Sequence, residues 1–66
     1  MARQSLELSR EKVLARLKRE GWIARTGGSH DIFTHADKPQ RIIVLPRHRT
    51  LSPGVARNTA KAAGWI

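Results

Sequence analysis

Residues 27–33, with the sequence GGSHDIF, place an ionisable ring directly after a two-glycine turn. Near neutral pH, the imidazole of His30 could accept or donate one proton. RNA would need little else from a protein, because the ribose 2′-hydroxyl beside the scissile phosphate supplies the nucleophile. Gly27 and Gly28 have no side chains, so a phosphate could approach the backbone amides closely. From the spacing alone, the more common explanation is a simple hairpin turn with His30 as a half-exposed strand residue.

Other kinds of catalytic chemistry have few candidates in this chain. Cysteine is absent, which excludes disulfides, thiolate metal sites and a cysteine nucleophile. The histidines, His30, His35 and His48, do not have the helical spacing of four residues that suits zinc, and no Gly-x-Ser-x-Gly motif indicates a serine hydrolase. Asp31 and Asp37 form no recognisable ligand pattern either. The sequence therefore predicts no metal site and no cofactor.

Charge is the strongest compositional signal. Thirteen Lys and Arg residues against five Asp and Glu give a formal net charge of +8, which favours a polyanionic partner and salt-dependent binding. Nucleic acid, an anionic membrane and an acidic protein all fit this charge, as does a surface that serves only solubility. Arg25, Arg47 and Arg49 flank the glycine turn and a later Pro-x-His sequence. We interpret these three arginines as candidate phosphate contacts.

The apolar segments of the chain are short. The longest uninterrupted run, Ile42 to Leu45, is far below the roughly 18 residues needed to span a bilayer, and the N-terminal residues lack the apolar stretch of a secretion signal. We therefore expect a cytoplasmic protein without a membrane contact. In a strand, the same run presents apolar side chains on both faces, so one face stays open for a partner when helices cover the other.

Two helices and three strands are predicted to position these residues. One helix begins after the cap Ser9 and ends at Gly21; the second has Ser52 as its cap and Pro53 in its first position, and ends at Gly64. Strands are predicted over residues 22–26, 30–35 and 40–46, joined by turn-forming sequences. This order predicts an α+β fold in which two helices cover one face of a three-stranded antiparallel sheet. A single domain spans residues 1–66, with residues 1–8 as a poorly ordered lead-in.

The inner faces of the two predicted helices differ in composition. The first helix has an apolar stripe formed by Val13, Leu14 and Leu17. The stripe of the second helix is small and partly polar, and is formed by Val55, Thr59 and Ala63. We therefore expect the second helix to depend on its neighbours for stability. His35, at the end of the second predicted strand, is expected at the surface.

Across roughly residues 9–66, the sequences EGW, GGSHDIF, VLPRH, LSPG and AAG occur in the order that is typical of one family. In this respect the chain resembles the HicA family, the small toxins of bacterial and archaeal toxin–antitoxin pairs. The resemblance implies an α-β-β-β-α fold like that of double-stranded-RNA-binding domains. It also implies an mRNA interferase activity and a HicB-like antitoxin as the protein partner.

The resemblance also implies roles for individual residues. His30 stands at the catalytic histidine of the family, preceded by Gly28 and Ser29 of the same motif. Pro46 and His48 match a Pro-x-His sequence of the family. His48 could be a second acid or a phosphate contact, although a histidine after a proline at a strand end is more often a structural loop residue.

The last helix departs from the family pattern, because Ala56 and Ala60 replace larger apolar residues and Asn58 replaces an aliphatic one.

Two interpretations without catalysis stay open at this point. A non-catalytic RNA-binding module of the same fold would use the same cations but would not need His30. A small ribosome-associated protein is favoured by the charge but not by the order of the motifs. The prediction we carry forward is a metal-independent ribonuclease toxin with His30 as general base or acid.

Overall fold

The computed structural model describes residues 6–66 of the chain. Two helices and three strands follow one another in the predicted order. Their bounds are α1, Arg10–Arg19; β1, Ile23–Gly27; β2, His30–Thr34; β3, Ile42–Pro46; and α2, Pro53–Ala63. This α-β-β-β-α arrangement confirms the predicted α+β fold. None of the helices in the described part of the chain is long and apolar enough to cross a membrane.

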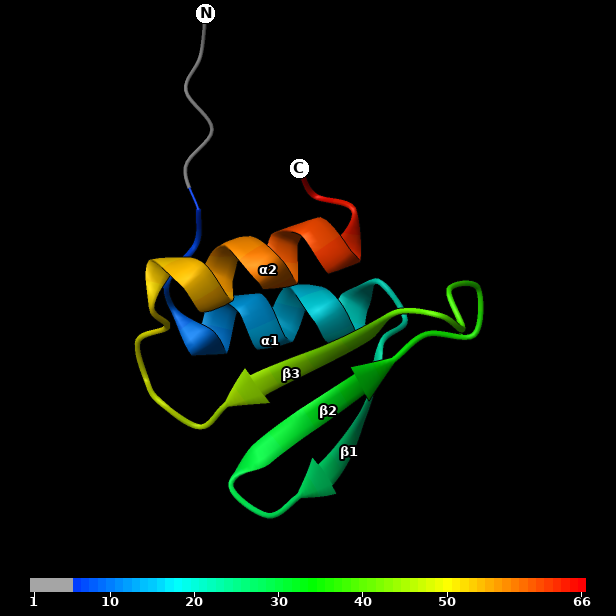
Figure 1. Cartoon of the computed structure of the whole chain (residues 1–66), viewed down its shortest axis with the longest axis horizontal. Helices are drawn as coiled ribbons and strands as arrows, with labels where there is room; N and C mark the ends of the chain where they lie inside the picture. Colours follow the sequence, from blue (N-terminus) through cyan, green and yellow to red (C-terminus); the bar gives the residue numbers. More distant parts are fainter. Residues whose placement is uncertain (1–5) are drawn as a thin grey trace, which may run out of the picture.

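The sheet is an antiparallel meander with β2 in the middle. Figure 1 shows both helices on the same side of this sheet, which leaves the other side uncovered. We call the uncovered side the open face.

Gly28 and Ser29 form the turn between β1 and β2, and Gly28 has a φ of +61°, a left-handed conformation that glycine adopts without strain. The predicted hairpin turn at the two glycines is therefore confirmed.

The helix ends follow the local signals in the sequence. The Ser9 hydroxyl accepts a hydrogen bond from the Lys12 amide at 3.4 Å, and the Ser52 hydroxyl accepts one from the Val55 amide at 3.3 Å. Gly64 ends α2 with a left-handed φ of +81°. Each cap satisfies a backbone amide that the helix itself leaves free. The predicted caps Ser9 and Ser52 and the stop at Gly64 are confirmed.

The core lies between the sheet and the two helices. Its largest fully buried side chains are Phe33, Leu17, Leu45 and Leu51. Of the stripe predicted for α1, Val13 and Leu17 are buried and Leu14 is half-buried. Leu6 and Leu8, which fall in the stretch expected to be poorly ordered, pack against this core, whereas residues 1–5 lie outside the described residues.

The inner face of α2 is built from small side chains. Thr59 and Ala63 are buried as predicted, whereas Val55 is only half-buried, and Ala56 and Ala60 are buried as well. α2 packs along β3 through this face. Small side chains let a helix backbone approach a sheet closely, so the alanines that depart from the family pattern have a place in this core.

His35 differs from the expectation of a surface residue. It directly follows β2, and its ring is half-buried against the edge of the Trp22 ring, with 5.2 Å between the ring centroids. Its Nε2 lies 2.8 Å from the carbonyl oxygen of Glu20, and its Nδ1 accepts a hydrogen bond from the Asp37 amide at 3.0 Å. The acceptor role of Nδ1 assigns the proton to Nε2, which donates to Glu20. His35 therefore ties the loop after β2 to the end of α1.

Candidate functional site at the glycine-turn end of the sheet

His30 is the first residue of β2, at the end of the sheet that carries the glycine turn. Its cross-strand neighbours are Gly27 on β1 and Pro46 on β3. Phe33 is fully buried on the helix side, and side chains alternate along a strand, so His30 lies on the open face. Gly27 has no side chain to cover the ring from the β1 side. The imidazole is accordingly exposed to solvent.

Ser29 and Gly28 complete the immediate surroundings of His30. The Ser29 hydroxyl lies 3.1 Å from Nδ1 of His30 and can donate or accept, depending on the tautomer of the ring. No other hydrogen bond to this ring occurs among residues 6–66. A side chain built at Gly28 would meet nothing within 4 Å, so the space above the turn is open. A ligand could therefore reach both Nε2 of His30 and the backbone of the turn.

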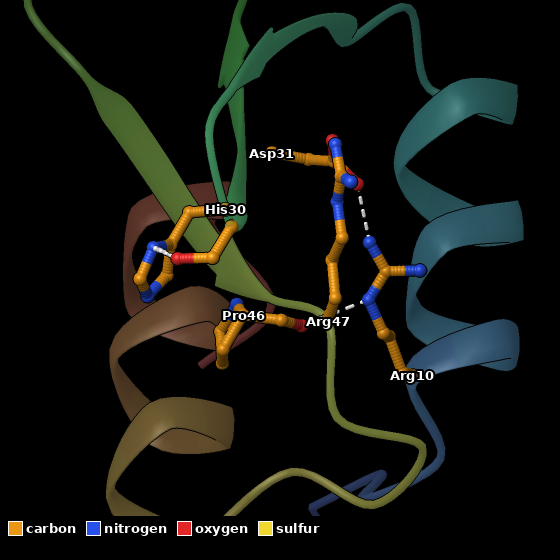
Figure 2. Close-up of polar contacts among 6 residues, drawn as sticks. Arg10, His30, Asp31, Pro46 and Arg47 are labelled. Atoms are coloured by element: carbon orange, nitrogen blue, oxygen red, sulfur yellow. Dashed lines mark hydrogen bonds and ion pairs between the residues drawn. The ribbon is translucent and has the colours of Figure 1, made fainter.

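Asp31, the next residue of β2, points to the helix side of the sheet and is held by two arginines (Figure 2). Nη2 of Arg10 pairs with one carboxylate oxygen, and Nη2 of Arg47 donates to the other at 3.1 Å. Nε of Arg10 also donates to the carbonyl oxygen of Pro46 at 2.8 Å. Arg10 therefore joins the first turn of α1 to the ends of both β2 and β3.

The neighbouring arginines lower the pKa of the Asp31 carboxyl. The hydrogen bond from Arg47 is the largest cause that holds the pKa of the Asp31 carboxyl below its ordinary value of 3.8, and Arg10 acts in the same direction. Asp31 is therefore ionised at neutral pH and neutralises only one of the two arginines. The helix side of this sheet end keeps a net positive charge.

The arginines predicted as phosphate contacts divide between the two sides of the sheet. Arg25 is exposed on the open face, opposite Ile32 and two positions along the strand from the Gly27–His30 pair. Arg47 is on the helix side, where Asp31 holds it. Arg49 is exposed. It lies beside Arg10, because the Arg10 amide donates a hydrogen bond to the carbonyl oxygen of Arg49 at 3.1 Å.

His48 lies in the loop after β3 and is exposed. No hydrogen bond of its ring to another of the described residues is present. A role of His48 as a second acid or a phosphate contact stays a prediction. Within residues 6–66, no group of three His, Asp or Glu side chains is placed to hold a metal ion.

The sequence analysis missed the ion pair between Arg10 and Asp31. Asp31 was considered only as a metal ligand, and no cationic partner was predicted for it. The alternation along β2 carried the missing signal, because Phe33 faces the core and the residue two positions earlier must face the same side. A carboxylate on that side needs a cationic partner, and the first turn of the helix that covers the sheet offers one.

A comparison with models of known protein families gives a match to most of the chain. Residues 10–65 match the model for the HicA toxin of bacterial toxin–antitoxin systems. No curated protein and no solved structure gives a significant match.

Proposed function

The chain belongs to the HicA toxin family, and from this premise we propose that it is a metal-independent ribonuclease that cleaves messenger RNA, which it meets in the cytoplasm, and so blocks translation. The observation that carries the proposal is the state of His30. Its ring is exposed at a strand end, Nε2 has no protein partner among residues 6–66, and a left-handed glycine turn lies beside it. A histidine in this state can exchange a proton with a ligand.

The proposed reaction uses the RNA as its own nucleophile. As general base, His30 removes the proton of a ribose 2′-hydroxyl, the 2′-oxygen bonds to the adjacent phosphorus, and the bond from phosphorus to the 5′-oxygen of the next nucleotide breaks. The leaving oxygen takes a proton from water or from the protonated imidazole. The products are a 2′,3′-cyclic phosphate and a 5′-hydroxyl. As general acid, the same ring would instead protonate the leaving oxygen, and water would take the proton of the 2′-hydroxyl.

Charge on the phosphate increases in the transition state, and the groups around His30 can offset it. The amides of Gly28 and Ser29 at the open turn can donate to phosphate oxygens. Arg25 on the open face, and Arg47 and Arg49 on the helix side, can bind neighbouring phosphates of the RNA. His48 is close in sequence to the last two and supplies at most a weaker contact.

The proposed protein partner is a HicB-like antitoxin that covers the open face. The exposed apolar side chains of this face are Ile23, Ile42 and Val44, with exposed fractions of 66%, 60% and 51%. They share the face with His30, as the antiparallel register requires. An acidic partner would be attracted by the net charge of +8, and burial of these side chains would keep it bound. Such a partner would block access to His30.

A non-catalytic RNA-binding module is the second candidate. The observation that favours it is the lack of a second acid or base beside His30 among residues 6–66, because Ser29 is the only side chain that bonds the ring. Such a module would bind RNA through the same arginines and leave it intact.

One experiment separates these two candidates. Purified protein is incubated with a messenger RNA in excess chelator, and the new RNA ends are identified. The proposal predicts cleavage with 2′,3′-cyclic phosphate and 5′-hydroxyl ends, and none with His30→Ala. Intact RNA that is nevertheless bound would support the module instead. Cleavage that needs a divalent ion would contradict the proposed mechanism.

A further inference from the structure

A pocket on the helix side of the same sheet end contains Arg47 and Arg49, which the proposed function uses only as phosphate contacts. It has a volume of about 290 Å³ and is lined by Arg10, Glu11, Leu14, Arg47 and Arg49. Sites for small molecules begin at about 300 Å³, so the pocket lies at the lower limit of that range and is large enough for no more than part or all of one nucleotide. Figure 2 shows Arg10 and Arg47 converging on Asp31, which fixes two walls of this pocket.

Three of the residues that line the pocket are arginines, which could bind an anion. Arg47 donates one hydrogen bond to Asp31, and Arg10 donates to Asp31 and to the carbonyl of Pro46. Each guanidinium has five N–H groups, so donors remain for a phosphate. The amide of Arg10 donates to the carbonyl of Arg49, which keeps the third arginine beside the first.

Leu14 and Glu11 also line the pocket, and a phosphate ligand alone would not account for them. Leu14 is half-buried and presents an apolar surface, against which a planar ring can pack. Glu11 is exposed and has no ion pair or side-chain hydrogen bond with another residue of the described part of the chain. A carboxylate repels a phosphate but accepts hydrogen bonds from a base. An apolar surface, an anion site and a free acceptor together match a nucleotide.

We propose that this pocket binds one guanine nucleotide of the RNA substrate and that Glu11 selects the base. Guanine is the RNA base with two adjacent donors, N1–H and the N2 amino group, on its Watson–Crick edge, and a carboxylate has two oxygens to receive them. Specific RNA recognition commonly reads this edge on bases that have left a stack. This proposal specifies part of the RNA substrate, and its biological role rests on the ribonuclease activity proposed above.

The position of the pocket also restricts the substrate. His30 and Asp31 are consecutive residues of β2, so His30 lies on the open face and the pocket lies on the opposite side of the same sheet end. An RNA that contacts both must bend over the end of the sheet near Pro46. A single strand or a loop can bend in this way, whereas a regular duplex cannot. The pocket therefore selects unpaired RNA.

Nucleotide binding tests the pocket without any cleavage. The full chain is titrated with guanosine, adenosine, cytidine and uridine 5′-monophosphates, with inorganic phosphate, and with guanosine, and the backbone amides are followed by NMR. Guanosine monophosphate should shift the amides of residues 10–14 and 47–49 and bind about tenfold tighter than the other nucleotides, as one bidentate base contact allows. It should also bind tighter than phosphate or guanosine alone.

Two variants show whether Glu11 is responsible. Glu11→Gln should remove the tenfold preference for guanine, because an amide cannot accept both hydrogen bonds. Asp37→Asn is the matched control, since Asp37 is an exposed acidic residue outside the pocket, and it should keep the preference. Equal affinity for the four nucleotides, or for phosphate and guanosine monophosphate, would overturn the proposal.

Mapping of cleavage sites on a randomised RNA connects the pocket to the reaction. The wild type should show guanosine enriched at one fixed position relative to the cut, and Glu11→Gln should lower this enrichment about tenfold. Guanine-selective binding without cleavage by any form would contradict the ribonuclease and leave the pocket supported. Cleavage with no enrichment at any position would contradict the pocket and leave the ribonuclease supported.

Discussion

Two histidines stand at the two ends of the central strand, and their surroundings are opposite. His30 begins β2, is exposed, and has only the adjacent Ser29 hydroxyl as a partner among residues 6–66. His35 follows the end of β2, and both of its ring nitrogens are bonded to backbone groups, those of Glu20 and Asp37. A ring with a free nitrogen can exchange a proton with a substrate, whereas a ring with two backbone partners holds the fold together. The residue type alone does not distinguish these roles.

The charged groups differ between the two ends in the same way. At the His35 end, Glu20 accepts hydrogen bonds from Nε1 of Trp65 at 2.8 Å and from Nε of Arg16 at 3.0 Å. The Arg16 guanidinium also lies 4.1 Å from the centre of the Trp65 ring. The bond from Trp65 is the main cause that lowers the pKa of Glu20. These groups satisfy one another, whereas at the His30 end Arg10 and Arg47 share the Asp31 carboxylate.

The largest effect is expected from His30→Ala. Loss of a general base or acid should lower the rate of RNA cleavage by about 10²- to 10⁴-fold. The free energy of unfolding should change by less than about 0.5 kcal/mol, because the exposed ring makes few contacts. Single-turnover cleavage and thermal unfolding measure the two quantities, and His48→Ala should leave both unchanged. A His30→Ala protein that still cleaves RNA would show that His30 is not the catalytic residue.

His35→Ala should have the opposite result. The substitution removes two hydrogen bonds to backbone groups and the contact with Trp22, which should cost about 1–3 kcal/mol of unfolding free energy. Urea unfolding measures this loss. Cleavage per folded molecule, measured where the variant stays folded, should remain that of the wild type. If stability is unchanged, the two ends of the strand do not differ as described.

The antitoxin should distinguish the two histidines chemically. A small histidine-modifying reagent should react with His30 in the free toxin and not in the complex, because the proposed partner would cover the open face. Mass spectrometry of the modified peptides gives both results. The complex should also dissociate slowly at high salt, since burial of Ile23, Ile42 and Val44 controls dissociation and charge mainly controls association. A His30 that reacts equally in the complex would contradict this mode of inhibition.

A smaller effect is expected from charge reversal at Arg47 and Arg49. Each phosphate contact to a single strand contributes about 0.7 to the slope of log affinity against log salt. Loss of two contacts should therefore make the slope shallower by about 1.4. Binding of a non-cleaved RNA analogue over a salt series measures the change, with Arg57→Glu, on the exposed face of α2, as a control of equal charge change per residue. Equal slopes in all three proteins would show that these arginines do not bind phosphates.

The smallest effect concerns the acid stability of the Asp31 cluster. The pKa of Asp31 in the folded protein lies below its ordinary value of 3.8, so its ion pairs stabilise the fold above that pH and are lost as the pH falls through the folded pKa. Asp31→Asn lacks this contribution at every pH. The difference in melting temperature between wild type and variant should therefore narrow from about pH 5 to about pH 2. A constant difference would show that the carboxylate charge does not stabilise this sheet end.

The sequence by itself determined the features that depend on neighbouring residues. The caps Ser9 and Ser52, the stop at Gly64 and the turn at Gly28 were predicted correctly because a cap or turn joins residues within one to four positions. The division of residues 42–45 into two exposed and two buried side chains followed from the same local rule, the alternation of side chains along a strand. The position of His30 after the glycine turn also belongs to this class.

The tertiary structure decided which distant residues meet. Asp31 pairs with Arg10, which is 21 positions away, and the His35 ring bonds to Glu20, which is 15 positions away. Each pair depends on how a helix lies across the sheet, and several residues of similar type could have filled each place. The sequence therefore could not show that His35 is structural, that Arg47 shares a carboxylate with Arg10, or that these arginines enclose a pocket with Glu11. Packing of the helices on one side of the sheet brings these groups together, because only that arrangement buries Phe33 and Leu17 in one core.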